Sequence, residues 1–129
     1  MVQFTEPQVI LFVRDPEQAA TFYSSFGFVE SFRTPQANPV KIEMTHGDFT
    51  LGLATPESAA AAHAIEANSK PNRAVVVLWT DDVPAAYKLA LDAGARDIQA
   101  PHIYRDTLLM AFVEDLDGHP MHLVCQVDG

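Results

Sequence analysis

The sequence predicts an α+β fold made of two tandem βαβββ units, and an internal repeat is the main observation behind this prediction. The segments DPEQAATFYSSFGF and DVPAAYKLALDAGA share capping residues and an apolar face. Asp82 follows Asp15 by 67 positions, and Gly94 follows Gly27 by the same 67. One strand-forming run precedes each segment and three follow it. One structural unit is therefore expected twice.

The first unit is predicted to open with a strand over Gln8–Arg14, and a helix follows Asp15. Asp15 is a candidate N-cap, Pro16 lies in the first turn, and Gly27 stands just past the end. Apolar residues at i, i+3, i+4 and i+7 give this helix one face to bury: Ala19, Phe22, Tyr23 and Phe26. Three more predicted strands complete the unit: Phe28–Arg33, Val40–Thr45 and Phe49–Ala54.

The second unit is predicted to have the same order of elements: one strand, one helix and three strands. A strand over Arg73–Thr80 precedes a helix that begins after Asp82. The helix has the equivalent face in smaller residues: Ala86, Leu89, Ala90 and Ala93. The predicted strands that follow are Ala95–Gln99, Thr107–Val113 and Met121–Val127. Both leading strands contain an uninterrupted apolar run, which is typical of strands buried on both faces.

A single domain is expected to include both units, because 129 residues is an ordinary domain length. The expected boundaries are residues 6–55 for the first unit and 73–127 for the second. The alanine-rich segment between them, residues 56–72, is predicted to be a short linker helix.

The composition excludes several classes of function. A net charge of −9 argues against nucleic acid as a partner and is compatible with a cationic ligand. No apolar run approaches the roughly 20 residues that span a bilayer, and no basic segment precedes the first apolar run. Cys125 is the single cysteine, which excludes an internal disulfide. We therefore expect a cytoplasmic protein without a membrane partner.

The stretch EDLDGHPMH, from Glu114 to His122, has the composition of a metal site, an acid/base cluster or a polar turn. His119 and His122 are three residues apart, and such residues on a strand point to opposite faces. A calcium loop would need a glutamate that the spacing after Gly118 does not supply. The stretch is therefore best interpreted as a hairpin turn around Asp117-Gly118.

Two motifs carry a resemblance to a known family. The pattern D-P-x-x-A-x-x-F-Y-x-x-x-G-F of the first helix and the pattern E-D-x-D-G-H-x-x-x-L near the end resemble the vicinal oxygen chelate superfamily. This group includes glyoxalase I, bleomycin-resistance proteins and extradiol dioxygenases. The resemblance covers about Gln8 to Gln126. It implies the glyoxalase/bleomycin-resistance fold, with a mixed sheet curled around a cleft, and a homodimer.

In the metal enzymes of the family, four strand positions hold one divalent ion. The resemblance places these positions at Gln8, Gly52, Val75 and His122. Gly52 and Val75 offer no donor, and Gln8 is either a ligand or a polar residue at a strand entrance. Catalytic zinc takes three protein ligands, so Gln8 and His122 are weak metal candidates. We expect neither a metal nor another cofactor.

The alternation of side chains along a strand predicts what lines the cleft instead. Phe12 shares the cleft side with Gln8, and Trp79 shares it with Val75. Tyr104 precedes a strand and is expected near the mouth. The predicted ligand-binding residues are therefore Gln8, Phe12, Trp79, Tyr104 and His122, with core filling or a dimer interface as the alternative role of the aromatic residues. Glu43 and Glu114 are candidates to meet a cation.

The sequence leaves three functions open. The first is metal-independent binding of a small aromatic or cationic molecule, of which antibiotic sequestration is one form. The second is a metal-dependent lyase, isomerase or dioxygenase that uses Gln8 and His122, with Glu43 and His46 in reserve. The third is a metal-free enzyme with His122 as general base. No catalytic residue is otherwise assigned.

Overall fold

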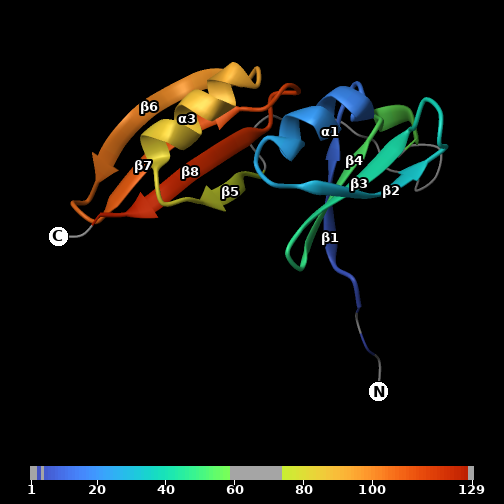
Figure 1. Ribbon diagram of the computed structural model, residues 1–129, viewed down its shortest axis with the longest axis horizontal. Coiled ribbons are helices and arrows are strands. Elements are labelled where there is room, and N and C mark those ends of the chain that lie inside the picture. The colour runs from blue at the N-terminus through green and yellow to red at the C-terminus, as the bar shows by residue number, and fades with distance from the viewer. Residues whose placement is uncertain (1–2, 4, 59–73, 128–129) are drawn as a thin grey trace. The chain divides into compact units, whose positions relative to one another are not determined.

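The computed structural model describes residue 3, residues 5–58 and residues 74–127, and the chain divides into two compact units, residues 1–69 and 70–129. Each unit contains a four-stranded mixed sheet with a helix lying across it (Figure 1). The sheets are curled and not closed. The predicted α+β fold of two βαβββ units is confirmed.

The first unit has the strand order β1-β4-β3-β2. Strand β1 pairs parallel with β4, and the other neighbours pair antiparallel. Its elements are β1 (Gln8–Phe12), α1 (Pro16–Ser24), β2 (Val29–Thr34), β3 (Lys41–His46) and β4 (Phe49–Ala54).

Helix α1 begins and ends where the capping residues predict. The side chain of Asp15 accepts hydrogen bonds from the backbone N–H groups of Glu17 and Gln18, at 3.0 and 3.3 Å. Gly27 follows the helix with a φ of +91°, a conformation that side chains disfavour. The helix packs on one face of its sheet, and together they bury Phe22, Tyr23, Leu11, Ile42, Met44, Leu51 and Leu53.

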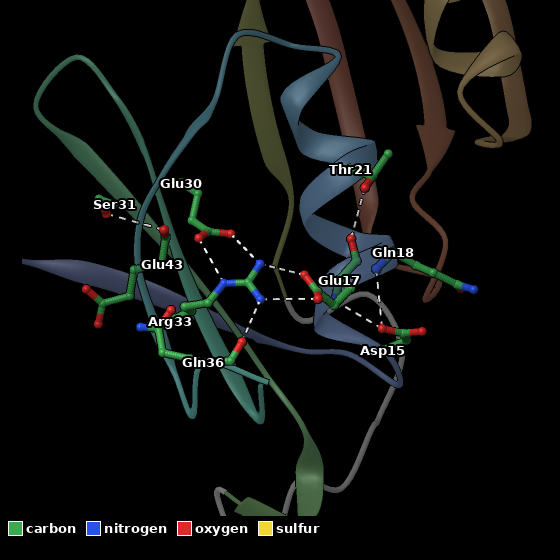
Figure 2. A network of polar contacts seen from close by, with 9 residues as sticks. All are labelled: Asp15, Glu17, Gln18, Thr21, Glu30, Ser31, Arg33, Gln36 and Glu43. Carbon is green, nitrogen blue, oxygen red and sulfur yellow. Dashed lines mark hydrogen bonds and ion pairs between the residues drawn. The ribbon is translucent and has the colours of Figure 1, made fainter. Parts of the chain in front are cut away.

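An arginine joins α1 to β2 (Figure 2). The guanidinium of Arg33 donates two hydrogen bonds to the carboxylate of Glu30, two to that of Glu17, and one to the carbonyl oxygen of Gln36. These bonds use all five of its N–H groups. The hydrogen bonds that Arg33 donates lower the pKa of Glu30, and the acceptance of these bonds by Glu30 and then by Glu17 raises the pKa of Arg33. This network holds the helix to the edge strand of the sheet.

The second unit has the equivalent strand order, β5-β8-β7-β6. Strand β5 pairs parallel with β8, and the other pairs are antiparallel. The Asp82 side chain accepts a hydrogen bond from the N–H of Ala85 at 3.0 Å and caps the helix. The elements are β5 (Val76–Trp79), α3 (Val83–Asp92), β6 (Arg96–Tyr104), β7 (Leu108–Glu114) and β8 (Pro120–Gln126).

Two expectations for the second unit are wrong. Strand β6 does not end at Gln99 but continues through Pro101 to Tyr104, with register shifts against β7 on the way. Proline is tolerated there because β6 is an edge strand, where a missing backbone N–H costs no ladder hydrogen bond. Strand β5 is not buried on both faces, since Val77 and Trp79 are 44% and 63% exposed, and β1 of the first unit fails the same expectation with Val9 49% exposed.

The linker helix predicted over residues 56–72 lies outside the described residues except at 56–58, which are helical. Among the helices in the described parts of the chain, none is long and apolar enough to cross a membrane.

Candidate functional site

In the second unit, the sheet face turned away from α3 gathers aromatic residues. Side chains alternate between the faces of a strand, and the register of the four strands shows which of them share a face. Ala111, Val113, Met121 and Leu123 form the buried face toward α3. The opposite side is called the helix-free face of this unit. It includes Val77 and Trp79 of β5, His122 and Val124 of β8, Met110 and Phe112 of β7, and His102 and Tyr104 of β6.

Three rings stack across this face from β6 to β8. The rings of Phe112 and His122 are nearly parallel, at 10°, with centroids 4.6 Å apart. His102 stacks on the same Phe112 with centroids 6.4 Å apart and an angle of 28°. The Nδ1 atom of His102 lies 2.9 Å from the carbonyl oxygen of Ala100 and donates to it in the neutral ring. The stack therefore fixes both imidazoles in orientation.

One nitrogen in the stack has no partner. The Nε2 atom of His122 is enclosed and makes no hydrogen bond to any of the described residues. Burial, and to a smaller extent the charge of His102, lowers the pKa of His122. The ring is therefore neutral near pH 7, and its Nε2 is a polar atom that lacks a hydrogen bond within the described residues.

The carboxylates expected to meet a cation are already paired. Glu114, on the helix-free face, accepts a hydrogen bond of 2.6 Å from Nε of Arg96. In the first unit, Glu43 forms an ion pair with Nζ of Lys41 at 3.0 Å. Each of these acidic groups has its charge balanced by a neighbour on its own sheet.

Trp79 and Tyr104 flank the stack and are exposed. Trp79 lies opposite Val124 on the edge strand β5. Tyr104 ends β6, is 42% exposed, and has the guanidinium carbon of Arg105 at 5.2 Å from its ring centroid. Trp79, Tyr104 and His122, three of the five predicted ligand-binding residues, therefore share one face of one sheet.

The other two predicted residues, Gln8 and Phe12, lie on the helix-free face of the first unit. Ile10 lies between them in β1 and pairs with Gly52 of β4. A Cβ atom at Gly52 would stand 2.9 Å from Cγ1 of Ile10 and 3.1 Å from Oε1 of Gln8, so Gly52 shares this face. The neighbours Leu51 and Leu53 are buried on the other face, at 1% and 0% exposure.

The side chains at the four metal positions do not fit a catalytic divalent ion. Gly52 and Val75 supply no donor atom, and within residues 5–58 and 74–127 no three His, Cys, Asp or Glu residues gather as a metal site would require. The reserve pair also fails, because Glu43 shares the parity of the helix-free face whereas His46 packs edge-on against Phe28, with centroids 5.2 Å apart.

The polar stretch before β8 is the predicted turn, organised by Asp115. This side chain is 5% exposed, and its Oδ1 accepts hydrogen bonds from the N–H groups of Asp117 and His119, each at 2.9 Å. Its Oδ2 lies 2.8 Å from Nδ1 of His119. Burial alone would lower the pKa of His119, but the bond to Asp115 and the charges of Asp115 and Asp117 outweigh it and raise the pKa. The carboxylate of Asp115 is therefore occupied by hydrogen bonds within the turn.

His102 and Phe112 are site residues that the sequence did not reveal. His102 lies beyond Pro101, where the strand was expected to have ended. The signal that was available is the alternation in β7 and β8, since Phe112 is paired with His122 and must share its face.

Comparison with known proteins agrees with the fold. The model of the Glyoxalase/Bleomycin resistance protein/Dioxygenase superfamily matches residues 6–123. No curated protein matches the sequence.

Solved structures with the same fold include proteins from several bacteria. A hypothetical protein from S. aureus has 25% identity and a TM-score of 0.79, with 96% of this chain and 94% of that chain covered. A glyoxalase/bleomycin resistance protein/dioxygenase family enzyme from Burkholderia phytofirmans PsJN has 21% identity and a TM-score of 0.81, with 92% and 96% covered. A lactoylglutathione lyase from Agrobacterium tumefaciens has 18% identity and a TM-score of 0.67, with 92% and 91% covered. The last two likenesses concern the fold alone.

Proposed function

The chain belongs to the Glyoxalase/Bleomycin resistance protein/Dioxygenase superfamily, and from that premise we propose that it binds a small aromatic or cationic molecule without a catalytic metal. The observation that carries the proposal is the helix-free face of the second unit. There Trp79 and Tyr104 are exposed beside a stacked histidine with an unpartnered nitrogen. Aromatic surfaces with a few polar groups are typical of small-molecule sites. Antibiotic sequestration is one form that this function takes.

The replacement of metal donors supports the metal-independent form of the proposal. At the positions where metal enzymes of this family hold an ion, Gly52 and Val75 have no donor, and the amide of Gln8 is a weak one. A single imidazole, His122, does not make a catalytic centre with them. The ligand is therefore proposed to bind through stacking and a hydrogen bond.

Trp79 provides the test, because it is the only tryptophan of the chain. Aromatic and cationic compounds titrated into the protein are expected to change its fluorescence at micromolar concentrations. The change should survive removal of divalent ions by a chelator and should weaken in a His122→Ala variant. A variant at exposed Lys88, on α3, is the matched control and should bind as the wild type does. Absence of any response would remove the support for this function.

A metal-dependent lyase, isomerase or dioxygenase is the second candidate, and the fold shared with a lactoylglutathione lyase favours it. Gln8 and His122 are its remaining ligands, with further donors unidentified. Elemental analysis of purified protein separates the two candidates. Stoichiometric nickel, zinc, iron or manganese that is lost in His122→Ala would establish the enzyme and contradict the binding protein.

A metal-free enzyme is a third form, and the neutral ring of His122 favours it, because a general base must accept a proton. Turnover of a bound compound after chelation, abolished in His122→Ala, would identify it. For any of these functions we propose a cytoplasmic homodimer whose partner is a small molecule and neither nucleic acid nor a membrane.

A further inference from the structure

We infer that the molecule bound by the second unit is planar, uncharged and aromatic, and that it carries one hydrogen-bonding group which meets Nε2 of His122. This inference rests on the function proposed above and chooses between its aromatic and cationic ligands.

The position of the hydrogen bond is fixed by the stack. The His122 ring lies flat on Phe112, and Phe112 is held on its other side by His102, whose Nδ1 is engaged with the Ala100 carbonyl oxygen. The stack therefore holds the plane of the His122 ring. A ring nitrogen that is enclosed and unpartnered among the described residues is costly, and a ligand group that pairs with it restores the lost hydrogen bond.

The absence of unbalanced charge on this face favours an uncharged ligand. Arg96 pairs with Glu114, and Arg105 lies over Tyr104. The register places no other carboxylate or guanidinium of the described residues on this face, whose remaining side chains are apolar, aromatic, imidazole or amide groups. A cation would find no free carboxylate there, and an anion would find only Arg105, in the turn beside Leu108 and four residues along β7 from Phe112, so either would lose hydration without a partner at His122.

The shape of the ligand follows from the strand spacing. His122 lies directly opposite Val77, and Trp79 is its diagonal neighbour on β5. The Cα atoms of such diagonal neighbours are about 7–8 Å apart. A fused bicyclic ring has a length of that order, so one end can contact the exposed Trp79 indole while the other reaches Nε2 of His122.

The same groups are expected to make ligand binding depend on pH. The titratable and charged groups that face His122 are His102 and Arg96 on β6 and Glu114 on β7, while β5 contributes none between Val76 and Trp79. Protonation of His122 places a charge beside His102 and replaces the neutral ring that the ligand meets. Binding of an uncharged ligand should therefore weaken when the pH falls below neutrality.

Four probes of one shape test the inference: 2-naphthol, naphthalene, 1-methylquinolinium and 2-naphthoate. They are a neutral hydrogen-bonding ring, a neutral ring without a polar group, a cation and an anion. Binding is measured by equilibrium dialysis near neutral pH at about 0.15 M salt, which screens the overall charge of the protein. We expect 2-naphthol to bind about three- to ten-fold more tightly than naphthalene, the effect of one hydrogen bond, and at least as much more tightly than either ion.

Two variants test whether the tighter binding of 2-naphthol depends on the ring nitrogen of His122. His122→Phe keeps a ring on Phe112 and deletes the nitrogen, so it should reduce 2-naphthol binding to that of naphthalene. His46→Ala, in the first unit, should change neither. Because the ranking of the probes is measured on the wild type, it stands even where a variant folds poorly.

The outcomes separate this inference from the proposed function. Tighter binding of 1-methylquinolinium or 2-naphthoate would overturn the uncharged ligand and keep a small-molecule binding protein. Equal binding of 2-naphthol and naphthalene, unchanged in His122→Phe, would overturn the hydrogen bond. Failure of all four probes to bind would overturn both.

Discussion

His122 and His119 lie three residues apart, and their surroundings act on their charges in opposite ways. His119 contacts the buried carboxylate of Asp115, which favours the imidazolium form and raises its pKa. His122 lies on Phe112 without a carboxylate partner, and burial lowers its pKa. The carboxylate in the turn therefore favours the charged form of one histidine, whereas the surroundings of the other favour a neutral ring.

The lowered pKa of His122 makes stability depend on pH with a defined sign. A histidine with an ordinary pKa of 6.5 in the unfolded chain binds a proton more readily there than in the folded protein. Folding stability should therefore fall as the pH drops through about 6.5 toward the lower folded value.

The His122→Phe variant should lack this loss, and the measurement is the urea midpoint between about pH 8 and pH 5. His119 contributes the opposite slope, because its stabilising charge is present below its unfolded pKa of 6.5 and is lost as the pH rises through the raised folded value. Both proteins contain His119, so their difference isolates His122. Parallel curves for the two proteins would contradict the assignment.

Gly52 is a second residue whose role can be measured. An added Cβ would approach Cγ1 of Ile10 to 2.9 Å, and this atom belongs to a β-branched side chain that moves little. Gly52→Ala should therefore destabilise the protein by about 1–3 kcal/mol, as overpacking does. Urea unfolding measures it. The control is Gly47→Ala, whose added Cβ meets nothing within 4 Å but whose φ of +59° disfavours a side chain. It should cost only backbone strain, about 1–2 kcal/mol; a fully neutral Gly52→Ala would show that Ile10 can move aside.

At the scale of one residue, the sequence shows where a metal-binding side chain is missing more readily than it shows which side chains form a site. Gly52 and Val75 could be identified as non-ligands from the family resemblance, because neither side chain has a donor atom in any orientation. The stack could not, since it depends on the pairing of Phe112 with His122 and on a register shift that brings His102 opposite Met110. Register is set by tertiary pairing, and the sequence carries little of it locally.

The hairpin that joins β6 and β7 contains two residues with an unfavourable backbone. Arg105 and Asp106 have φ values of +52° and +58°, in the left-handed region that costs most side chains about 1–2 kcal/mol. Glycine adopts this conformation freely but loses more entropy on folding, about 0.5–1 kcal/mol. The strain that glycine relieves exceeds the entropy that it loses, so glycine at this turn should give a small net gain in folding stability.

Asp106→Gly should therefore stabilise the protein by roughly 0.5–1 kcal/mol, seen as a rise of a few degrees in Tm. The Arg105 contact with Tyr104 remains in this variant. Asp48→Gly is the matched control, because Asp48 occupies the β3–β4 turn without a positive φ. It should give no gain. A lower Tm for Asp106→Gly would mean that the aspartate side chain contributes more than the backbone strain costs.

Elements with strong local signals were predicted well, and those defined by their neighbours were not. Both helices begin at the predicted aspartates, because the cap is a local hydrogen bond to the next turn. Strand β6 was predicted to end five residues too early, at Gln99 instead of Tyr104, since a proline such as Pro101 ends a central strand but not an edge strand. Its position at the edge is a property of the whole sheet.

At the scale of the whole molecule, the two units share an architecture and differ in their helix-free faces. The row Ile10, Gly52 and Glu43 in the first unit corresponds to the row Val77, His122 and Phe112 in the second. The first row contains a glycine and an acid paired with Lys41, and the second contains the ring stack. Repetition of the fold therefore does not repeat the chemistry, and the ligand site is inferred for the second unit alone.

The sheet edges also differ in a way that bears on assembly. The edge strand β2 contains Glu30 and Arg33 and a register shift, and β6 contains Pro101 and further shifts. Charges, prolines and bulges of this kind protect an edge from pairing with another chain. The edges β1 and β5, with the sequences QVILF and VVLW, have none of these features.

Apolar residues on the two unprotected edges are exposed in the chain, with Val9 at 49% and Trp79 at 63%. We therefore expect light scattering to give twice the chain mass of 14.1 kDa. Val9→Lys, which places a charge on the edge strand β1, should shift the protein toward the mass of one chain. Val29→Lys, on the already protected strand β2, should leave the dimer intact although Val29 is more exposed, at 66%. A wild type with the mass of one chain, or equal behaviour of the two variants, would show that edge protection does not control assembly.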